Sequence, residues 1–244
     1  GGTVAAAAIG PRRLAHGAPR DSVLGLTVAL ASGEVVRTGS RMVKNVAGYD
    51  LTKLLVGSLG SLGFVAGITI KVRPRPRTTA GLVHTFASVA RAIAFVRRIR
   101  EVDLFPAALV LTGPTLETAF EGSEAAVRYQ VERTEALSLE LGASPAGRPA
   151  RPSDACRLRA NLPTDRALYF AAGLDVPGFA YAGSGVVYLL VPADGGTIRR
   201  LRIAAEAHGG RLVVEDAPPG AEPAIDRWGA RDPAGACHPQ GDLR

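Results

Sequence analysis

The sequence predicts an α+β fold, and three observations lead to that prediction. The chain has 244 residues, of which 47% are hydrophobic, which is enough to build a core and excludes a disordered chain. Residues 1–77 combine alternating apolar runs with a glycine-rich loop, whereas residues 78–217 alternate strand patterns with amphipathic helices. We therefore expect two domains with these bounds and an antiparallel sheet in the second. Residues 218–244 are polar and rich in Pro and Gly, which predicts a poorly structured C-terminal tail.

The first domain is expected to contain a hairpin, a short helix and a strand. Their expected bounds are Val23–Gly39, Leu51–Val56 and Phe64–Val72. Asp50 is placed to cap the helix, whose apolar face would be formed by Leu51, Leu54 and Leu55. Two prolines that lack backbone donors, Pro74 and Pro76, end the strand and place the domain boundary near residue 77.

The second domain is expected to alternate strands with helices. The expected strands are Leu82–Phe86, Ala107–Leu111, Leu116–Glu121, Ala167–Ala171, Val186–Val191 and Arg211–Glu215. The expected helices are Ser88–Arg100, Glu124–Leu141 and Thr197–His208, with Ser88 as a cap and Gly142, Gly209 and Gly210 as stops. The segment Ala143–Pro152 has the composition of a loop or mobile linker, and no internal repeat is apparent.

Basic charge is concentrated in the first third of the chain. The net charge is +7, and residues 1–80 hold 11 Lys and Arg against 3 Asp and Glu, out of totals of 29 and 22. Such an excess suits nucleic acid, a membrane surface or an anionic cofactor. Nucleic acid is the weakest of these, because single-strand binders place aromatic platforms beside the charge and only Tyr49 and Phe64 occur here.

Neither a membrane helix nor a metal site is expected. The uncharged stretches Leu54–Ile70 and Val176–Ala193 contain glycines or prolines, so we interpret them as strands joined by turns. Cys156 and Cys237 have neither metal spacing nor a disulfide framework, which suits a reducing cytoplasm. The four histidines fall in unrelated elements, and no catalytic constellation is present, so the catalytic residues are left unassigned.

The most informative motif is the glycine loop Gly57-Ser58-Leu59-Gly60-Ser61-Leu62-Gly63. Glycine lets backbone N–H groups approach a ligand and adopts the positive φ angles of an anion-binding nest. The spacing and the order helix, loop, strand differ from the Rossmann fingerprint, and no Gly-Lys-Ser/Thr follows. By spacing alone, a ligand-binding loop and a tight structural turn are equally supported.

Two further clusters combine glycine with basic residues. They are Gly1-Gly2-Thr3 with Gly10-Pro11-Arg12-Arg13, and Gly17-Ala18-Pro19-Arg20-Asp21. One anionic ligand would explain these clusters and the charge excess together, because Arg offers charge and forked donors to phosphate. The alternative for each single Arg is a solvated surface residue.

Three segments in order resemble a known pattern: GGTVAAAAIGPRR, RDSVLGLTVALASGEVVRTG and KNVAGYDLTKLLVGSLGSLGFVAGITIKVRPRP. They resemble the second half of the FAD-binding (PCMH-type) domain of vanillyl-alcohol-oxidase (VAO) type flavoproteins. Within that group they are similar to the FAD-binding subunit of bacterial glycolate oxidase, whose members carry GPRRPW, RDFVLG, MKNVAGYDL and GSxGxLG. The second domain resembles the α+β cap, or substrate, domain by element order. Residues 232–239 resemble the closing DPxGxxNPGR signature.

The resemblance implies an FAD site. Its glycine loop would lie against the FAD phosphates and adenosine, and the Val65 backbone against the adenine. The residues carried over are Gly1, Gly2, Gly10, Arg12, Gly17, Asp21, Val23, Gly57, Ser58, Gly60, Ser61, Gly63 and Val65.

The implied function is that of an FAD-binding subunit of a glycolate or 2-hydroxy-acid dehydrogenase (oxidase) complex, in which the flavin accepts a hydride from the acid. The implied partners are a larger FAD-linked oxidase subunit and an iron–sulfur subunit. The implied location is cytoplasmic, at the inner face of the membrane through those partners. The alternative is a non-catalytic or degenerate assembly subunit that binds FAD weakly.

Three departures from the pattern argue against tight FAD binding by this chain alone, and the first of them favours the alternative. The family's first subdomain would precede Gly1, and because the only methionine is Met42, we expect an N-terminally truncated chain. The strand motif that usually contains Thr-Glu is Val65-Ala66-Gly67 here, and His238 stands where Asn is usual.

Overall fold

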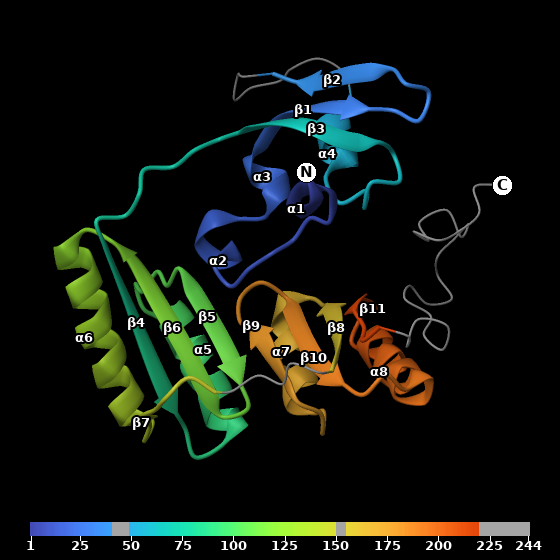
Figure 1. Ribbon diagram of the computed structural model, residues 1–244. Coiled ribbons are helices and arrows are strands. Elements are labelled where there is room, and N and C mark those ends of the chain that lie inside the picture. The colour runs from blue at the N-terminus through green and yellow to red at the C-terminus, as the bar shows by residue number, and fades with distance from the viewer. Residues whose placement is uncertain (41–48, 150–154, 220–244) are drawn as a thin grey trace. The chain divides into compact units, whose positions relative to one another are not determined.

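The computed structural model describes residues 1–40, 49–149 and 155–219 (Figure 1). The chain divides into two compact units, with the boundary between Arg75 and Pro76. Below, the first unit is residues 1–75 and the second is residues 76–219. The expected tail from residue 218 lies almost entirely outside the described residues, as does most of the motif MVKNVAGYDL.

The first unit is built on a three-stranded antiparallel sheet in the order β2-β1-β3. Its strands are β1 (Val23–Ala29), β2 (Val35–Gly39) and β3 (Phe64–Ile70). The expected hairpin is confirmed, with Gly33 at φ +85° in the turn. The strand β3 ends at Ile70, two residues before the position expected.

A short helix, α4 (Leu51–Leu55), packs against β1 and β2. The Asp50 carboxylate caps it by accepting from the Lys53 N–H at 3.2 Å, as expected. The expected apolar face is wrong, because Leu51 and Leu54 are 49% and 62% exposed. A helix of little more than one turn buries one side only, and that side carries Thr52 and Leu55. The Thr52 hydroxyl lies 3.0 Å from that of Thr38 on β2.

Three one-turn helices precede the sheet and were not predicted: α1 (Gly2–Ala5), α2 (Arg13–His16) and α3 (Pro19–Ser22). The core of the first unit joins α1, α4 and the strands. It consists of Val4, Val23, Leu26, Val28, Leu55, Val56 and Val65. The N-terminal segment is therefore packed into the unit through Val4.

The second unit contains one eight-stranded antiparallel sheet in the order β11-β8-β10-β9-β5-β6-β4-β7. The strands are β4 (Thr78–Thr85), β5 (Ala108–Thr112), β6 (Thr115–Gly122), β7 (Ser144–Pro145), β8 (Cys156–Asn161), β9 (Gly178–Tyr181), β10 (Val186–Val191) and β11 (Arg211–Asp216). The α+β class with an antiparallel sheet is thus confirmed.

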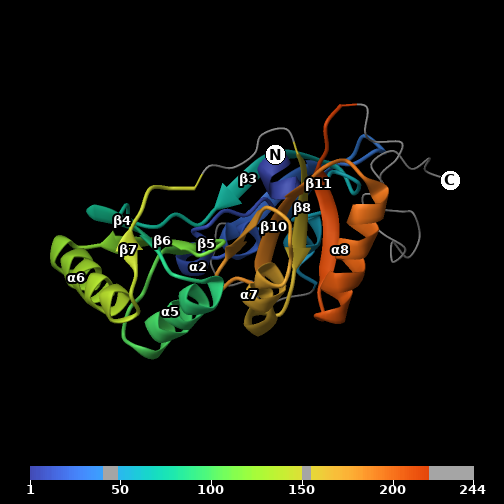
Figure 2. The same ribbon diagram turned by 90° about the horizontal axis from the view of Figure 1, so that it is seen from below.

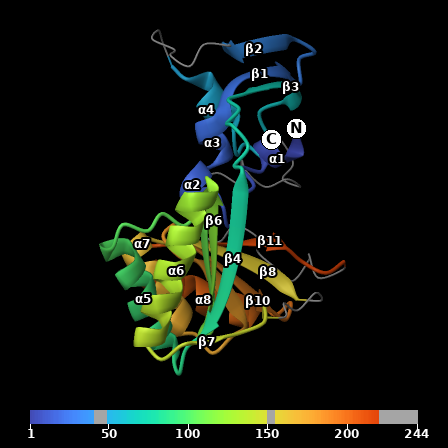
Figure 3. The ribbon, with the colours of Figure 1, turned by 90° about the vertical axis from the view of Figure 1, so that its left-hand side faces the viewer.

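Four helices cover one face of this sheet (Figure 2). They are α5 (Val89–Glu101), α6 (Glu124–Glu140), α7 (Thr164–Ala172) and α8 (Gly195–Ala207). Side chains cap three of them at the N-terminus, from Ser88, Ser123 and Asp194. The helix α6 lies against β4 and β6 (Figure 3).

The second unit repeats one motif twice. The elements β4-α5-β5-β6-α6-β7 and β8-α7-β9-β10-α8-β11 follow the same βαββαβ order. If the four strands of each set are numbered in chain order, they lie in the sheet in the order 4-1-3-2 in both sets. The second strands of the two sets, β5 and β9, pair with each other and join the halves. No repeat was apparent in the sequence. The order of helices and strands depends on the pattern of polar and apolar residues, so two segments can share it without sharing residue identities.

Two predictions for the second unit are wrong. Residues 167–171 form part of the helix α7 instead of a strand, since a short apolar run rich in Ala and Leu fits either element. The expected linker Ala143–Pro152 contributes β7, which pairs with the end of β4. Residues 150–152 of that segment lie outside the described chain.

Candidate functional site

The glycine loop runs from the end of α4 to the start of β3 and turns on residues with positive φ. These are Gly57 at +89°, Leu59 at +56°, Gly60 at +84° and Gly63 at +151°. A Cβ on Gly63 would lie 2.6 Å from Val28 Cγ1, so close approach to β1 demands glycine there. A Cβ on Gly60 would meet nothing within 4 Å. Gly63 therefore meets a packing need, whereas Gly60 borders open space.

The loop rests on the N-terminal segment. The Gly57 N–H donates to Val4 O at 3.1 Å, and the Leu59 N–H donates to Ala5 O at 2.8 Å. A Cβ on Gly1 would lie 2.9 Å from Val65 O. Three segments that the sequence analysis assigned to one site, Gly1-Gly2, the glycine loop and Val65, are thus brought together.

Several polar groups of the loop are left available. The Ser61 hydroxyl is used internally, since it donates to Ser58 O at 2.6 Å. The Ser58 hydroxyl oxygen, by contrast, is shielded from solvent and has no hydrogen-bond partner among the described residues. The backbone N–H groups of Gly60 and Leu62 likewise donate to no acceptor among the described residues.

These groups fit an anionic oxygen ligand. Backbone N–H groups in a turn that contains residues with positive φ can form an anion-binding concavity, and a hydroxyl adds a further donor. A buried hydroxyl without a partner costs about 1–3 kcal/mol, so a ligand oxygen beside Ser58 would recover part of that cost. The residues present therefore fit a phosphate group.

Gly17 and Asp21 form a local structure of their own. The Asp21 carboxylate accepts from the Ala18 N–H at 2.7 Å, at the N-terminus of α3. A Cβ on Gly17 would lie 2.7 Å from Asp21 Oδ2. Val23, at the start of β1, is a core residue with 3% exposure. These three residues have structural reasons to occupy their positions.

The remaining predicted residues lie on the surface of the first unit. Gly2, Gly10 and Arg12 are exposed, and Cβ atoms on the two glycines would meet nothing within 4 Å. Basic side chains also tie the unit together: Arg73 Nη1 donates to Ala15 O at 3.1 Å, and Lys53 Nζ donates to Arg20 O. Part of the basic excess therefore serves the local fold.

A charged and aromatic cluster in the second unit was missed by the sequence analysis. Arg157 and Arg159 on β8 pair with Glu215 on β11 at 3.1 and 3.3 Å. The ring of Tyr188 on β10 stacks on Phe179 with centroids 5.0 Å apart. Burial, followed by the charge of Glu215, raises the pKa of Tyr188 to about 12. The alternation Arg157-Leu158-Arg159 was the available signal for a half-buried strand.

The described residues give two further results. None of their helices is both long and apolar enough to cross a membrane. No group of three or more His, Cys, Asp and Glu side chains among them is arranged to hold a metal ion.

Comparison with curated proteins finds homologues among FAD-linked oxidoreductases. The glycolate oxidase subunit GlcE of Escherichia coli is 32% identical over 228 residues, which cover 88% of this chain and 62% of that protein. GlcD of Bacillus subtilis is 42% identical over 117 residues, 48% of this chain and 25% of its own length. A D-lactate dehydrogenase of Anaerostipes hadrus is 38% identical over 109 residues, 45% of this chain and 23% of the relative. The chain thus spans from about a quarter to about three fifths of these relatives. No family model matches it.

Solved structures show the same fold. A VAO-type flavoprotein of Myceliophthora thermophila aligns with a TM-score of 0.61 and 13% identity, covering 89% of this chain and 53% of that one. An alkyldihydroxyacetonephosphate synthase aligns with a TM-score of 0.60 and 13% identity, covering 86% and 53%. At such low identity the likeness establishes the fold alone.

Proposed function

Because the chain's homologues are glycolate oxidase subunits and other FAD-linked oxidoreductases, and its fold is that of VAO-type flavoproteins, we propose that its glycine loop holds the phosphates of FAD. The protein would then serve as a flavin-binding subunit of a complex that oxidises glycolate or a related 2-hydroxy acid. When bound, the flavin would supply the hydride acceptor for the carbon that carries the hydroxyl group.

One observation carries this proposal. The Ser58 hydroxyl and the N–H groups of Gly60 and Leu62 lack partners within the described chain, beside a glycine that borders open space. Such donors suit phosphate oxygens, and the open space beside Gly60 would let a phosphate approach the backbone there. Gly1, Gly57 and Val65 would form the wall of the site through main-chain atoms.

The assigned residues fall into three roles under this proposal. Gly57, Ser58, Gly60, Ser61 and Gly63 shape the loop, with Ser58 as a donor and Ser61 as an internal brace. Gly17, Asp21 and Val23 would act indirectly, by fixing the entry into β1. Gly2, Gly10 and Arg12 would contribute from the surface.

A second candidate is an assembly subunit that holds FAD weakly. Two features of the first unit favour it. Ala66 and Gly67 on β3 provide no polar side chain, and the Asp21 carboxylate is already engaged by the Ala18 N–H. Both features reduce the number of groups that could bind a flavin.

The partners would follow from either candidate. The names of the GlcD and GlcE relatives point to a complex of several subunits, so we propose a larger FAD-linked subunit and an iron–sulfur subunit as partners. The chain contains 2 cysteines, too few to ligate a four-cysteine cluster by itself. We also propose a cytoplasmic location, at the inner face of the membrane through the partner subunits.

Titration of the purified chain with FAD, followed by flavin fluorescence, tests the proposal. Saturable binding is expected, and Ser58→Ala is expected to weaken it about three- to tenfold, the value of one hydrogen bond. Ser144→Ala, on the exposed strand β7, is the matched control and should bind as the unaltered chain does.

The outcomes separate the two candidates. If the unaltered chain binds no FAD but still associates with a GlcD-type subunit, the assembly role replaces the flavin-binding role. If FAD binds and Ser58→Ala has no effect, the glycine loop is not the phosphate site.

A further inference from the structure

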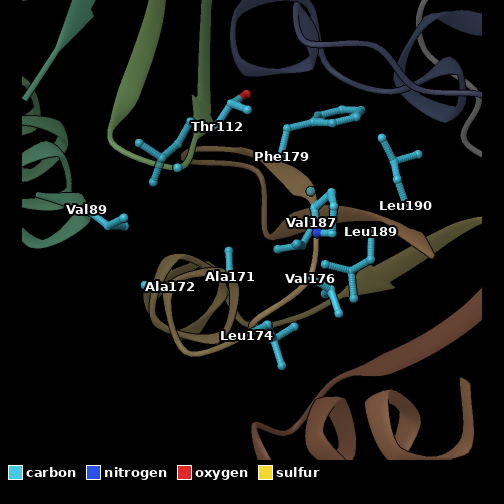
Figure 4. A pocket seen from close by; sticks show the side chains of 14 residues that line it. Val89, Thr112, Ala171, Ala172, Leu174, Val176, Phe179, Val187, Leu189 and Leu190 are labelled. Carbon is cyan, nitrogen blue, oxygen red and sulfur yellow. The ribbon is translucent and has the colours of Figure 1, made fainter. Parts of the chain in front are cut away.

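The glycine loop, rather than the pocket of the second unit, carries groups that suit an anion. That pocket has a volume of about 290 Å³, and none of its lining residues, such as Ala171, Leu174 and Val187, carries a charge (Figure 4). In the loop, the backbone N–H groups of Gly60 and Leu62 donate to no acceptor among the described residues, whereas those of the other loop residues do. Whatever holds these two donors in place therefore decides how well the loop can bind an anion.

The loop is tied to α1 at two positions, one on either side of Ser58. The Gly57 N–H donates to Val4 O at 3.1 Å, and the Leu59 N–H donates to Ala5 O at 2.8 Å. These bonds fix the backbone on both sides of the Ser58 hydroxyl, and the second fixes the residue directly before the first free N–H group. Carbonyl oxygens of the N-terminal segment therefore set the orientation of the groups proposed to meet phosphate.

Backbone strain is concentrated at this same junction. Among residues 1–40, 49–149 and 155–219, Ala7 and Leu59 are the only residues other than glycine with positive φ, at +46° and +56°. A Cβ on Gly57 would lie 3.3 Å from Ala7 Cβ, so both strained residues lie beside the bonds that tie the loop to α1. Left-handed conformations are unfavourable for residues with a Cβ and persist only where the surrounding structure holds them. The bond to α1 is therefore what keeps Leu59 left-handed.

The side chain of Val4 anchors α1 in the core of the first unit. It is 8% exposed and belongs to the cluster that includes Val56 and Val65. The Val4 carbonyl accepts from two N–H groups, those of Ala7 and Gly57, at 3.0 and 3.1 Å. Burial of the Val4 side chain therefore fixes the oxygen that holds the start of the loop.

We propose that Val4 and Leu59 are positioning residues for phosphate binding at the glycine loop. Val4 seats α1 in the core, and Leu59, held left-handed by its bond to α1, presents the Gly60 N–H and the Ser58 hydroxyl to the ligand. Both residues act through the backbone of the loop. This inference rests on the proposed binding of FAD phosphates by the loop, and it adds that the N-terminal segment preorganises that site.

Two substitutions at Leu59 test its role, with flavin fluorescence of the full chain as the measure of FAD affinity. Asparagine tolerates the left-handed region, whereas a β-branched residue is strongly disfavoured there. The Leu59 side chain is 43% exposed, so neither Leu59→Asn nor Leu59→Val disturbs the core. Leu59→Asn should bind FAD about three- to tenfold more tightly than Leu59→Val. Equal affinities of the two variants would refute the role of Leu59.

Val4→Ala tests the anchor, and Leu26→Ala is its control. Leu26 on β1 is 3% exposed in the same core, and its truncation removes more buried carbon. Val4→Ala should weaken FAD binding about three- to tenfold, whereas Leu26→Ala should lower stability at least as much and leave the affinity of the folded chain unchanged. In hydrogen exchange without ligand, the Gly57 and Leu59 amides should exchange about tenfold faster relative to those of β2 in Val4→Ala, but not in Leu26→Ala.

Two results with Val4→Ala would overturn the proposal. One is an equal loss of FAD affinity in Leu26→Ala, which would mean that only the stability of the unit matters. The other is an unchanged relative exchange rate of the Gly57 and Leu59 amides. If Val4→Ala fails to fold by circular dichroism, the pair of variants at Leu59 decides. If the unaltered chain binds no FAD, the proposed function fails instead, and the exchange measurement still decides whether Val4 holds the loop.

Discussion

Gly60 and Gly63 both have positive φ, but alanine should affect them very differently. At Gly60 an added methyl group meets nothing within 4 Å, so Gly60→Ala introduces only backbone strain, about 1–2 kcal/mol. At Gly63 the methyl group would lie 2.6 Å from Val28 Cγ1 and 2.8 Å from Ala29 O. The second contact is to backbone, so relief requires β1 and β3 to shift, which adds about 1–3 kcal/mol of overpacking to the strain.

The expected loss of stability is therefore about 1–2 kcal/mol for Gly60→Ala and about 2–5 kcal/mol for Gly63→Ala. Because the chain has two units, a single unfolding transition cannot be assumed. Hydrogen exchange of the amides in β1 and β3 reports the opening free energy of the first unit directly. An equal or greater loss in Gly60→Ala would refute the assignment of Gly63 to packing and of Gly60 to open space.

Three further predictions concern the second unit. His84 is buried and burial lowers its pKa from 6.5, with Glu135 opposing, so the unfolded chain binds more protons below that pH. The free energy of unfolding should therefore decrease as the pH falls from 7 to 5. This decrease should be smaller in His84→Leu, as measured by urea unfolding at the two pH values. The raised pKa of Tyr188, about 12 against 10.0, predicts a loss of about 1–2 kcal/mol as pH rises from 10 to 12. Tyr188→Phe should lack this loss. Urea unfolding at pH 9 and 11.5 measures it, and an equal free energy of unfolding of the unaltered chain at the two pH values would contradict the prediction. Ser123 accepts from the Ala126 N–H at 3.3 Å, so Ser123→Ala should cost about 1 kcal/mol in urea unfolding, whereas a neutral result would mean that water caps α6 equally well.

Elements with local signals were predicted well from the sequence. The helices α5, α6 and α8 each have a capping side chain, and α5 and α8 also have apolar periodicity; both are properties of neighbouring residues. The segment that forms α7 has no side-chain cap, and its apolar run is short, so periodicity could not separate helix from strand. The strand β8 was missed because its core residues alternate with arginines beside a Pro- and Arg-rich segment.

The candidate site was only partly predictable for a related reason. Glycine spacing identified the loop, and its positive φ angles follow from residue type. The hydrogen bonds from Gly57 and Leu59 to α1 join residues more than fifty positions apart, which no local pattern encodes. The difference between Ser58 and Ser61, one hydroxyl without a partner and one used within the loop, likewise depends on the folded geometry.

The joining of the two βαββαβ halves through β5 and β9 protects both strands from further pairing. Separated from its neighbour, either half would expose a bare edge of unpaired N–H and C=O groups along its second strand. Two copies of one half would then satisfy that edge by meeting across a true twofold axis and rebuilding an eight-stranded sheet as a homodimer. Sedimentation of residues 76–149 alone would reveal whether that half dimerises.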